Sequence, residues 1–121
     1  MKALTALEPA RVKAVLFDID DTLTTAGKLT TEAYGSLEQL KGAGKLVVAV
    51  TGRPAGWCDH IARMWPVDAV VGENGAFYFS LTGGKLHKRF HDEPGVRAAQ
   101  RHRLVAIGEG ILAAVPGCTR K

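Results

Sequence analysis

Two short clusters of polar residues carry the side chains best suited to chemistry in this chain. The first is the acidic run Asp18-Ile19-Asp20-Asp21-Thr22, and the second is Thr51-Gly52-Arg53-Pro54. An ionised aspartate can attack phosphorus and form an aspartyl phosphate, and a second carboxyl close by can protonate the leaving oxygen and later activate water. Asp18 and Asp20 suit these two roles.

The acidic cluster also has the composition of a metal site. At an effective dielectric near 20, two carboxylates about 4 Å apart repel each other by about 4 kcal/mol. A divalent cation offsets such repulsion, and Mg²⁺ usually combines one or two carboxylates with water and phosphate oxygens. A plain acidic turn after a strand is the alternative. It is weakened because the second cluster adds the Thr51 hydroxyl and a helix start at Pro54, where backbone amides can bind phosphate.

The elements before each cluster are predicted to bring the two together. Val12–Phe17 and Leu46–Val50 are nearly continuous apolar runs, which predicts parallel strands covered on both faces. Apolar residues recur at helical spacing over 30–41, so the three segments form a β-α-β unit. Ligands of open parallel sheets bind at the carboxyl ends of the strands. A right-handed crossover would therefore place Asp18 and Thr51 side by side.

The rest of the chain continues this alternation and then changes. The pattern predicts a helix over 54–65, a third parallel strand over 69–71, an antiparallel hairpin with strands over 76–80 and 85–90, and a helix over 95–115. In the first of these helices, Trp57, Ile61, Met64 and Trp65 recur at helical spacing and are expected to pack against the sheet. The order of elements predicts an α/β fold.

The two clusters resemble the first two motifs of the haloacid dehalogenase superfamily. Residues 15–23 are similar to its first motif, a hydrophobic strand followed by Asp-x-Asp-x-Thr, and residues 48–54 to its second. Residues 72–76, Gly-Glu-Asn-Gly-Ala, resemble the branch with a large α/β cap, which includes many sugar phosphatases. The resemblance implies a Rossmann-like, three-layer α/β/α core with a parallel sheet over 1–80. Residues 81–121 would then be a hairpin strand and helix that begin an incomplete cap or link the core to a missing C-terminal part.

The resemblance also implies a role for each matching residue. Asp18 would be the nucleophile and a metal ligand, and Asp20 the general acid and base that also gives its backbone carbonyl to Mg²⁺. Residues 22–29 would be a mobile flap beside the site. The binding roles would fall to Thr51 and Gly52 for phosphate, and to Arg53 and Asn74 on the substrate side. The last two residues also have plain structural interpretations, as a cation at a helix start and as a turn former.

The implied activity is Mg²⁺-dependent hydrolysis of a phosphomonoester, a sugar phosphate or a similar small metabolite, through an aspartyl phosphate. A phosphomutase would share the first two motifs, and an acid at Asp20 argues against dehalogenation. The family's later lysine and Gly-Asp-x-x-x-Asp-like metal motif have no counterpart, since Asp92, Glu93 and Glu109 are the acidic residues after Gly75. We therefore expect an N-terminal portion of a phosphatase. The alternative is a catalytically incomplete module that binds phosphate or a partner protein.

The same comparison predicts a contact between copies of the chain. In the family, further strands lie beside the first strand, and this sequence has no counterpart of them. Val12–Phe17 would then be an apolar sheet edge, which is a template for pairing with another chain. We expect self-association through this strand.

The overall composition limits the partners. The chain has 121 residues, 46% hydrophobic, 7% aromatic and 23% charged, with a formal net charge of +4, as in soluble globular proteins. It contains no apolar run of about 20 residues, and its N-terminus lacks a secretory signal pattern, which predicts a cytoplasmic protein without a membrane partner. In the basic segment 85–103, Phe90 is the only aromatic residue that could stack on bases, so no nucleic-acid partner is expected. Cys58 and Cys118 are expected to be buried free thiols.

Overall fold

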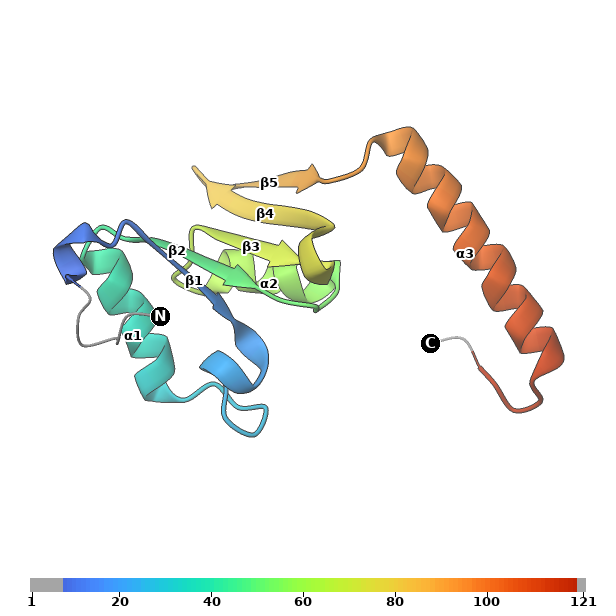
Figure 1. Cartoon of the computed structure of the whole chain (residues 1–121), viewed down its shortest axis with the longest axis horizontal. Helices are drawn as coiled ribbons and strands as arrows, with labels where there is room; N and C mark the ends of the chain where they lie inside the picture. Colours follow the sequence, from blue (N-terminus) through green and yellow to red (C-terminus); the bar gives the residue numbers. More distant parts are fainter. Residues whose placement is uncertain (1–7, 120–121) are drawn as a thin grey trace. The chain divides into compact units, whose positions relative to one another are not determined.

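The computed structural model describes residues 8–119, which form two compact units, the first ending at Phe90 and the second beginning at His91 (Figure 1). The elements of the first unit are η2 (Pro9–Arg11), β1 (Ala14–Asp18), η3 (Ile19–Leu23), α1 (Thr31–Gly42), β2 (Leu46–Val50), α2 (Ala55–Met64), β3 (Ala69–Gly72), η4 (Glu73–Gly75), β4 (Phe77–Thr82) and β5 (Lys85–Phe90). The second unit contains α3 (Pro94–Ala114). The predicted helices and strands are confirmed in type and order, with small shifts at their ends.

The strands form one mixed sheet in the order β1-β2-β3-β4-β5. The first three strands are parallel, and β4 and β5 form an antiparallel hairpin that continues the sheet from β3. In the register of β1 and β2, Asp18 lies opposite Val50. The carboxyl ends of these two strands therefore lie at the same edge of an α/β sheet, as the fold class requires.

Local sequence explains where the helices begin. The Thr30 hydroxyl accepts a hydrogen bond from the Ala33 amide at 3.2 Å and caps α1. Pro54 precedes α2 with an extended backbone, and its carbonyl accepts hydrogen bonds from the Trp57 and Cys58 amides. The helix α1 thus begins after the acidic turn that follows β1, and α2 begins directly after the polar cluster that follows β2.

The hydrophobic core lies between α2 and the sheet. Its buried members are Ile19, Ala49, Cys58, Ile61, Ala62, Val70, Phe77 and Phe79. The Phe77 and Phe79 rings stack with their centroids 4.6 Å apart. The expected stripe on α2 is wrong for Trp57 and Met64, which are 51% and 63% exposed. The expectation is confirmed for Ile61, and the helix buries Cys58 and Ala62 beside it.

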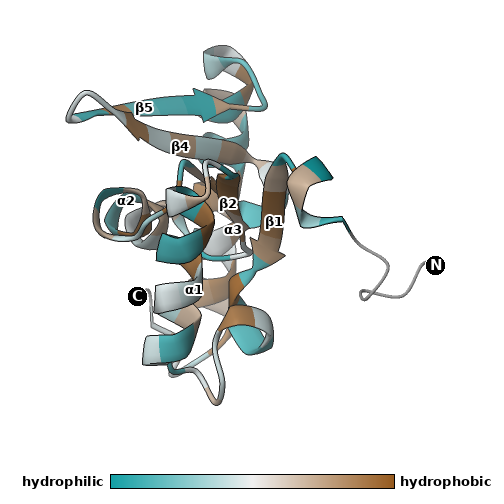
Figure 2. Ribbon diagram, turned by 90° about the vertical axis from the view of Figure 1, so that its left-hand side faces the viewer, coloured by the Kyte–Doolittle hydropathy of each residue, from teal (hydrophilic) through white to brown (hydrophobic). Residues whose placement is uncertain are grey.

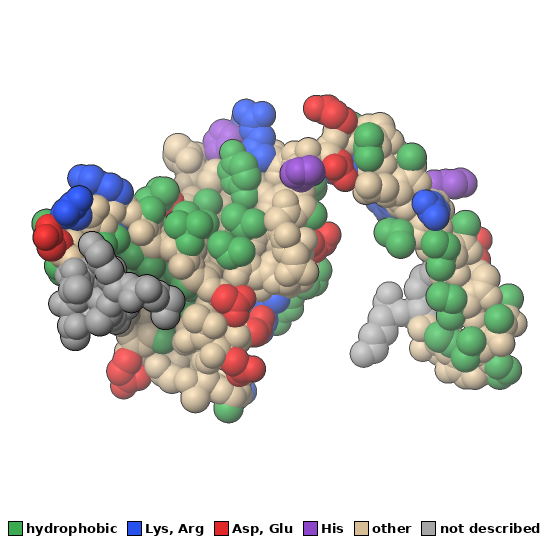
Figure 3. Space-filling view, in the orientation of Figure 1, with side chains coloured by type: hydrophobic (Ala, Val, Ile, Leu, Met, Phe, Trp, Pro, Cys, Tyr) green, Lys and Arg blue, Asp and Glu red, His purple; other side chains and the backbone are tan. Residues whose placement is uncertain are grey.

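Both helices of the first unit lie on one face of the sheet. The strands β1, β2 and β3 are added in one direction, so right-handed crossovers put α1 and α2 on the same side. Val47 and Ala49 on that side are fully buried, whereas Leu16 and Tyr78 on the other side are 65% and 44% exposed. Hydrophobic side chains are visible over the strands in Figure 3. The prediction that the apolar strands are covered on both faces is therefore wrong for residues 8–90.

The second unit consists mainly of α3, which contains no buried residue. Its large apolar side chains are exposed as well, with Leu104, Ile107 and Ile111 at 67%, 50% and 49%. Cys118 is also exposed, so the prediction of a buried thiol is wrong there and confirmed at Cys58. None of the helices within residues 8–119 has the length and apolar character needed to cross a membrane.

Candidate active site

The acidic cluster forms a tight turn directly after β1. Asp21 adopts a positive φ of 57°, which the short polar side chain of aspartate tolerates. The Thr24 hydroxyl, which is buried, donates to the Ile19 carbonyl at 2.9 Å and accepts from the Asp21 amide at 3.3 Å. These two hydrogen bonds of Thr24 stabilise the turn, and the backbone of the turn determines the direction of each carboxylate.

Asp18 is the last residue of β1 and its side chain is exposed. One carboxylate oxygen, Oδ2, accepts a hydrogen bond from the Thr22 hydroxyl at 3.3 Å. Among the described residues, no lysine, arginine or histidine forms an ion pair with Asp18. The carboxylate is therefore accessible from solvent and keeps most of its acceptor capacity.

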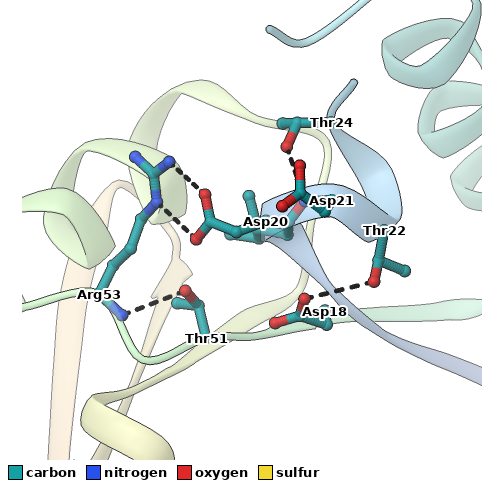
Figure 4. A network of polar contacts seen from close by, with 8 residues as sticks. Asp18, Asp20, Asp21, Thr22, Thr24, Thr51 and Arg53 are labelled. Atoms are coloured by element: carbon teal, nitrogen blue, oxygen red, sulfur yellow. Dashed lines mark hydrogen bonds and ion pairs between the residues drawn. The ribbon is translucent and has the colours of Figure 1, made fainter. Parts of the chain in front are cut away.

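Asp20 has a different environment because Arg53 holds it. Arg53 Nε donates to Asp20 Oδ2 at 3.0 Å, and a second guanidinium nitrogen donates to Oδ1. These hydrogen bonds, together with the charge of Arg53, lower the pKa of Asp20 and raise the pKa of Arg53. The guanidinium also lies 4.5 Å from the centre of the Trp57 ring. Figure 4 shows the Asp20 carboxylate turned toward Arg53.

Thr51 follows β2 and is 2% exposed. Its amide donates to the Val71 carbonyl at 2.9 Å, and its hydroxyl accepts from the Arg53 amide at 3.1 Å. The hydroxyl thus stabilises the loop that leads into α2. Its oxygen lies at the same end of the sheet as the acidic turn (Figure 4).

A second loop, η4, packs against this one. The Asn74 amide donates to the Thr51 carbonyl, and the Glu73 amide donates to the Arg53 carbonyl, both at 3.2 Å. The Asn74 side chain lies so close to Gly52 that an added Cβ would be 3.2 Å from its Oδ1. Glu73 and Asn74 both have positive φ, and the two hydrogen bonds help hold this unfavourable backbone.

The structure thus brings the predicted residues to one end of the sheet. Asp18 and Asp20 lie on the turn after β1, and Thr51, Gly52 and Arg53 on the loop after β2. Asn74 lies beside Gly52 on the loop after β3. The predicted flap over 22–29 contains a turn closed by two hydrogen bonds between Thr25 and Lys28. The catalytic and binding roles of these residues stay predictions.

Sequence reasoning missed two residues that shape this site. Trp57 was assigned to the core but supports the guanidinium of Arg53. Its position four residues after an arginine at a helix start was the available signal. Thr24 was treated only as part of the flap, and no spacing in the sequence indicated that its hydroxyl would bond the turn.

The acidic cluster is only partly suited to a metal ion. Arg53 already neutralises Asp20, so it offsets part of the repulsion for which a cation was expected. Within residues 8–119 there is no group of three or more histidine, cysteine, aspartate or glutamate side chains placed to hold a metal ion. The groups that could contribute to a Mg²⁺ site are the Asp18 carboxylate and the Asp20 backbone carbonyl, with water and phosphate oxygens completing the coordination.

Comparisons with known proteins agree with this arrangement. A family model of haloacid dehalogenase-like hydrolases matches residues 15–91. A haloacid dehalogenase-like hydrolase from B. subtilis is similar in structure, with a TM-score of 0.58 and 23% identity, over 81% of this chain and 34% of that one. A hypothetical protein from Geobacillus kaustophilus is also similar in structure, with a TM-score of 0.51 and 29% identity, over 75% of this chain and 36% of that one.

A third similar structure is BT1666 from Bacteroides thetaiotaomicron, described among phosphatases of the HAD enzyme superfamily. Its TM-score is 0.56 at 24% identity, over 87% of this chain and 40% of that one. The chain therefore spans 34% to 40% of the length of these three structures. A comparison with curated proteins finds no match.

Proposed function

The chain belongs to the haloacid dehalogenase-like hydrolases, and from this we propose that the protein is a phosphomonoester hydrolase that works through an aspartyl phosphate on Asp18. The observation that carries the proposal is the state of Asp18. It ends β1 beside the loop of Thr51, it is exposed, and it forms no ion pair among the described residues. A carboxylate in this state is available as a nucleophile.

The proposed reaction has two displacements. In the first, a carboxylate oxygen of Asp18 forms a bond to phosphorus while the bond to the leaving oxygen breaks, and Asp20 gives that oxygen a proton. In the second, water attacks the phosphorus, Asp20 accepts a proton from this water, and the bond to Asp18 breaks to release phosphate. The Thr51 hydroxyl and the amides at the start of α2 would stabilise the charge on the phosphoryl oxygens.

Asp20 must change its partner to take part in these steps. Both of its oxygens are now bonded to Arg53, and the arginine favours the ionised form. A bound anionic substrate would compete for the same guanidinium. We propose that Arg53 exchanges Asp20 for the substrate, which would also give Arg53 its place on the substrate side of the site.

Mg²⁺ would be held by the Asp18 carboxylate and the Asp20 carbonyl. When bound, this ion would neutralise negative charge on the phosphoryl group of the substrate. The substrate we propose is a small phosphorylated metabolite such as a sugar phosphate. This choice rests on the resemblance of residues 72–76 to the capped branch of the family, and Asn74 from that segment lies beside Gly52.

Two observations favour a second candidate function for the chain on its own. Arg53 restrains Asp20, and the described residues hold no group of three metal-binding side chains. Both features fit a module that binds phosphate without hydrolysing its esters. The loop after β2, which contains Thr51, and the first amides of α2 would still be available to bind an anion.

The test is hydrolysis of an aryl phosphate in the presence of Mg²⁺. Asp18→Asn should lower the rate by about a thousandfold or more, because it removes the nucleophile. The matched control is Asp21→Asn, which makes the same chemical change in the same turn and should keep most of the activity. Chelation of Mg²⁺ with EDTA should also abolish hydrolysis.

Equal rates for the wild type, Asp18→Asn and the EDTA-treated protein would contradict the hydrolase proposal. Binding of inorganic phosphate should then be measured by calorimetry, with Thr51→Val as the variant. Phosphate binding that Thr51→Val weakens, without hydrolysis, would support the second candidate. Trapping with beryllium fluoride tests separately whether Asp18 accepts a phosphoryl mimic.

A further inference from the structure

Trp57 lies on α2 but takes little part in the hydrophobic core. Figure 2 shows α2 as a helix of mixed hydropathy, with hydrophobic and hydrophilic residues along its ribbon. The hydrophobic residues Cys58 and Ile61 are buried against the sheet, whereas Trp57 is 51% exposed. A tryptophan side chain contributes most to stability when it is buried. The position of this ring is therefore explained by its contacts outside the core.

The indole ring of Trp57 contacts two polar side chains. The guanidinium carbon of Arg53 lies 4.5 Å from the centre of the ring. A guanidinium over an aromatic ring is attracted by the negative charge of the ring face. The His60 ring lies edge-on to the indole, with the two centroids 6.5 Å apart. The start of α2 thus presents an aromatic face to the guanidinium.

The backbone of Arg53 is held independently of its side chain. Its amide donates to the Thr51 hydroxyl at 3.1 Å, and its carbonyl accepts from the Glu73 amide at 3.2 Å. The Cys58 thiol also donates to this carbonyl, with 3.6 Å between sulfur and oxygen. The guanidinium takes no part in these hydrogen bonds. The side chain can therefore change its partner while the backbone of the loop after β2 stays in place.

Two contacts of the Arg53 side chain differ in kind. Asp20 accepts two hydrogen bonds from the guanidinium, which fix the direction of the guanidinium as well as its distance. The contact with Trp57 is attraction to a ring face and needs no oxygen acceptor. An anionic substrate would therefore compete with Asp20 for the guanidinium but not with Trp57.

We propose that Trp57 is a positioning residue, which keeps the Arg53 guanidinium at the site while Arg53 exchanges Asp20 for the anionic substrate. The role rests on the proposed function, because the exchange is part of it. In the free protein, the two hydrogen bonds to Asp20 also orient the guanidinium, so the ring is needed least in this state. Once these bonds are given up, an arginine without the ring regains the rotamer freedom of a long side chain. Loss of the Trp57 ring therefore weakens the substrate complex more than the free protein.

The first test follows the contact itself by NMR and needs neither substrate nor turnover. The ring current of Trp57 should shift the side-chain protons of Arg53 upfield, relative to their positions in Trp57→Leu. The same shift should persist in Asp20→Ala, because the ring holds the guanidinium without the carboxylate. If the shift disappears in Asp20→Ala, the carboxylate alone places the guanidinium, and the proposal is overturned.

The second test is the hydrolysis of p-nitrophenyl phosphate by the full 121-residue chain with Mg²⁺. Trp57→Leu should raise KM about three- to fivefold, which corresponds to a partly exposed cation–π contact, and change kcat by less than about twofold. Trp57→Phe keeps an aromatic face and should restore most of the affinity. In Arg53→Met, which lacks the guanidinium, adding Trp57→Leu should have no further effect on KM.

The matched control is Trp65→Leu, which makes the same chemical change at the other end of α2, where the side chain packs against the core. It should lower the melting temperature but leave KM unchanged. The proposal is overturned by an unchanged KM in Trp57→Leu, by an equal rise in Trp65→Leu, or by a Trp57→Leu effect that persists in Arg53→Met.

Failure of the proposed function has a different signature, because the wild type would then not hydrolyse the ester at all. In that case the same variants are compared by their Kd for inorganic phosphate. Trp57→Leu should again weaken binding about three- to fivefold, and only in the presence of Arg53. An unchanged Kd would overturn the role of Trp57 as well.

Discussion

Gly72→Ala is predicted to destabilise the protein through a collision in the core below the candidate site. Gly72 ends β3 and is buried. A Cβ at this position would lie 2.3 Å from Phe77 Cζ and 2.6 Å from Cys58 Sγ. Both neighbours are themselves buried, at 5% and 0% exposure, and neither can move into solvent without opening the core.

The expected magnitude follows from two opposing effects. Overpacking of this kind costs about 1 to 3 kcal/mol, and two close contacts favour the upper part of this range. Replacing glycine by alanine also restricts the unfolded chain, which stabilises the protein by about 0.4 to 1 kcal/mol. The net loss should be about 2 kcal/mol. For a domain of this size, such a loss lowers the melting temperature by about 10 °C.

Thermal unfolding followed by circular dichroism is the assay, with Gly56→Ala as the control. Gly56 lies in α2, and a Cβ there would meet nothing within 4 Å, so this substitution should be neutral or stabilising. In a double-mutant cycle, Phe77→Leu should recover part of the cost of Gly72→Ala, because it removes the ring atoms nearest to the new methyl group. If Gly72→Ala melts with the wild type, or if Phe77→Leu recovers nothing, the reasoning from close contact is refuted.

Two further predictions concern contacts that position the first helix and the second strand. Burial raises the pKa of Asp68, but hydrogen bonds from Lys41 and the Val47 amide, with the charge of Lys41, outweigh it and leave this pKa below 3.8. Asp68→Asn should therefore lower stability by about 1 kcal/mol at pH 7. In urea titrations, this difference should shrink as the pH falls below 3.8 toward the lowered value, since the carboxylate contributes only while ionised; a difference independent of pH would contradict the assignment. Thr30→Ala removes the cap of α1 and should cost about 1 kcal/mol of unfolding free energy, whereas Thr31→Ala should cost much less; equal effects would show that the cap contributes nothing.

The arrangement of the catalytic candidates was accessible from sequence because it follows from strand order. An apolar run that ends in Asp18 and another that ends before Thr51, joined by one helix, leave little choice but adjacent parallel strands. The types and order of the elements follow from the same periodic patterns. These signals are local or depend on a simple rule of chain connection, and therefore need no knowledge of the packed molecule.

The details of the site depended on tertiary packing. The pairing of Arg53 with Asp20 joins two loops, and nothing in either segment indicates which of the three aspartates the guanidinium will meet. The contact of Trp57 with that arginine depends on how far α2 is rotated against the sheet. One small rotation of a helix exchanges the buried and exposed sides of a hydrophobic stripe, which is why Trp57 and Met64 were assigned to the wrong side.

The sequence by itself determined the α/β order of elements and the meeting of the two polar clusters at one edge of a parallel sheet. Only the tertiary structure decided that Arg53 holds Asp20 while Asp18 forms no ion pair in the described chain, and that Leu16 is exposed on the face without helices. The physical reason is that periodicity and chain connection act along the chain. Ion pairing and burial, in contrast, depend on which surfaces meet once the chain has folded.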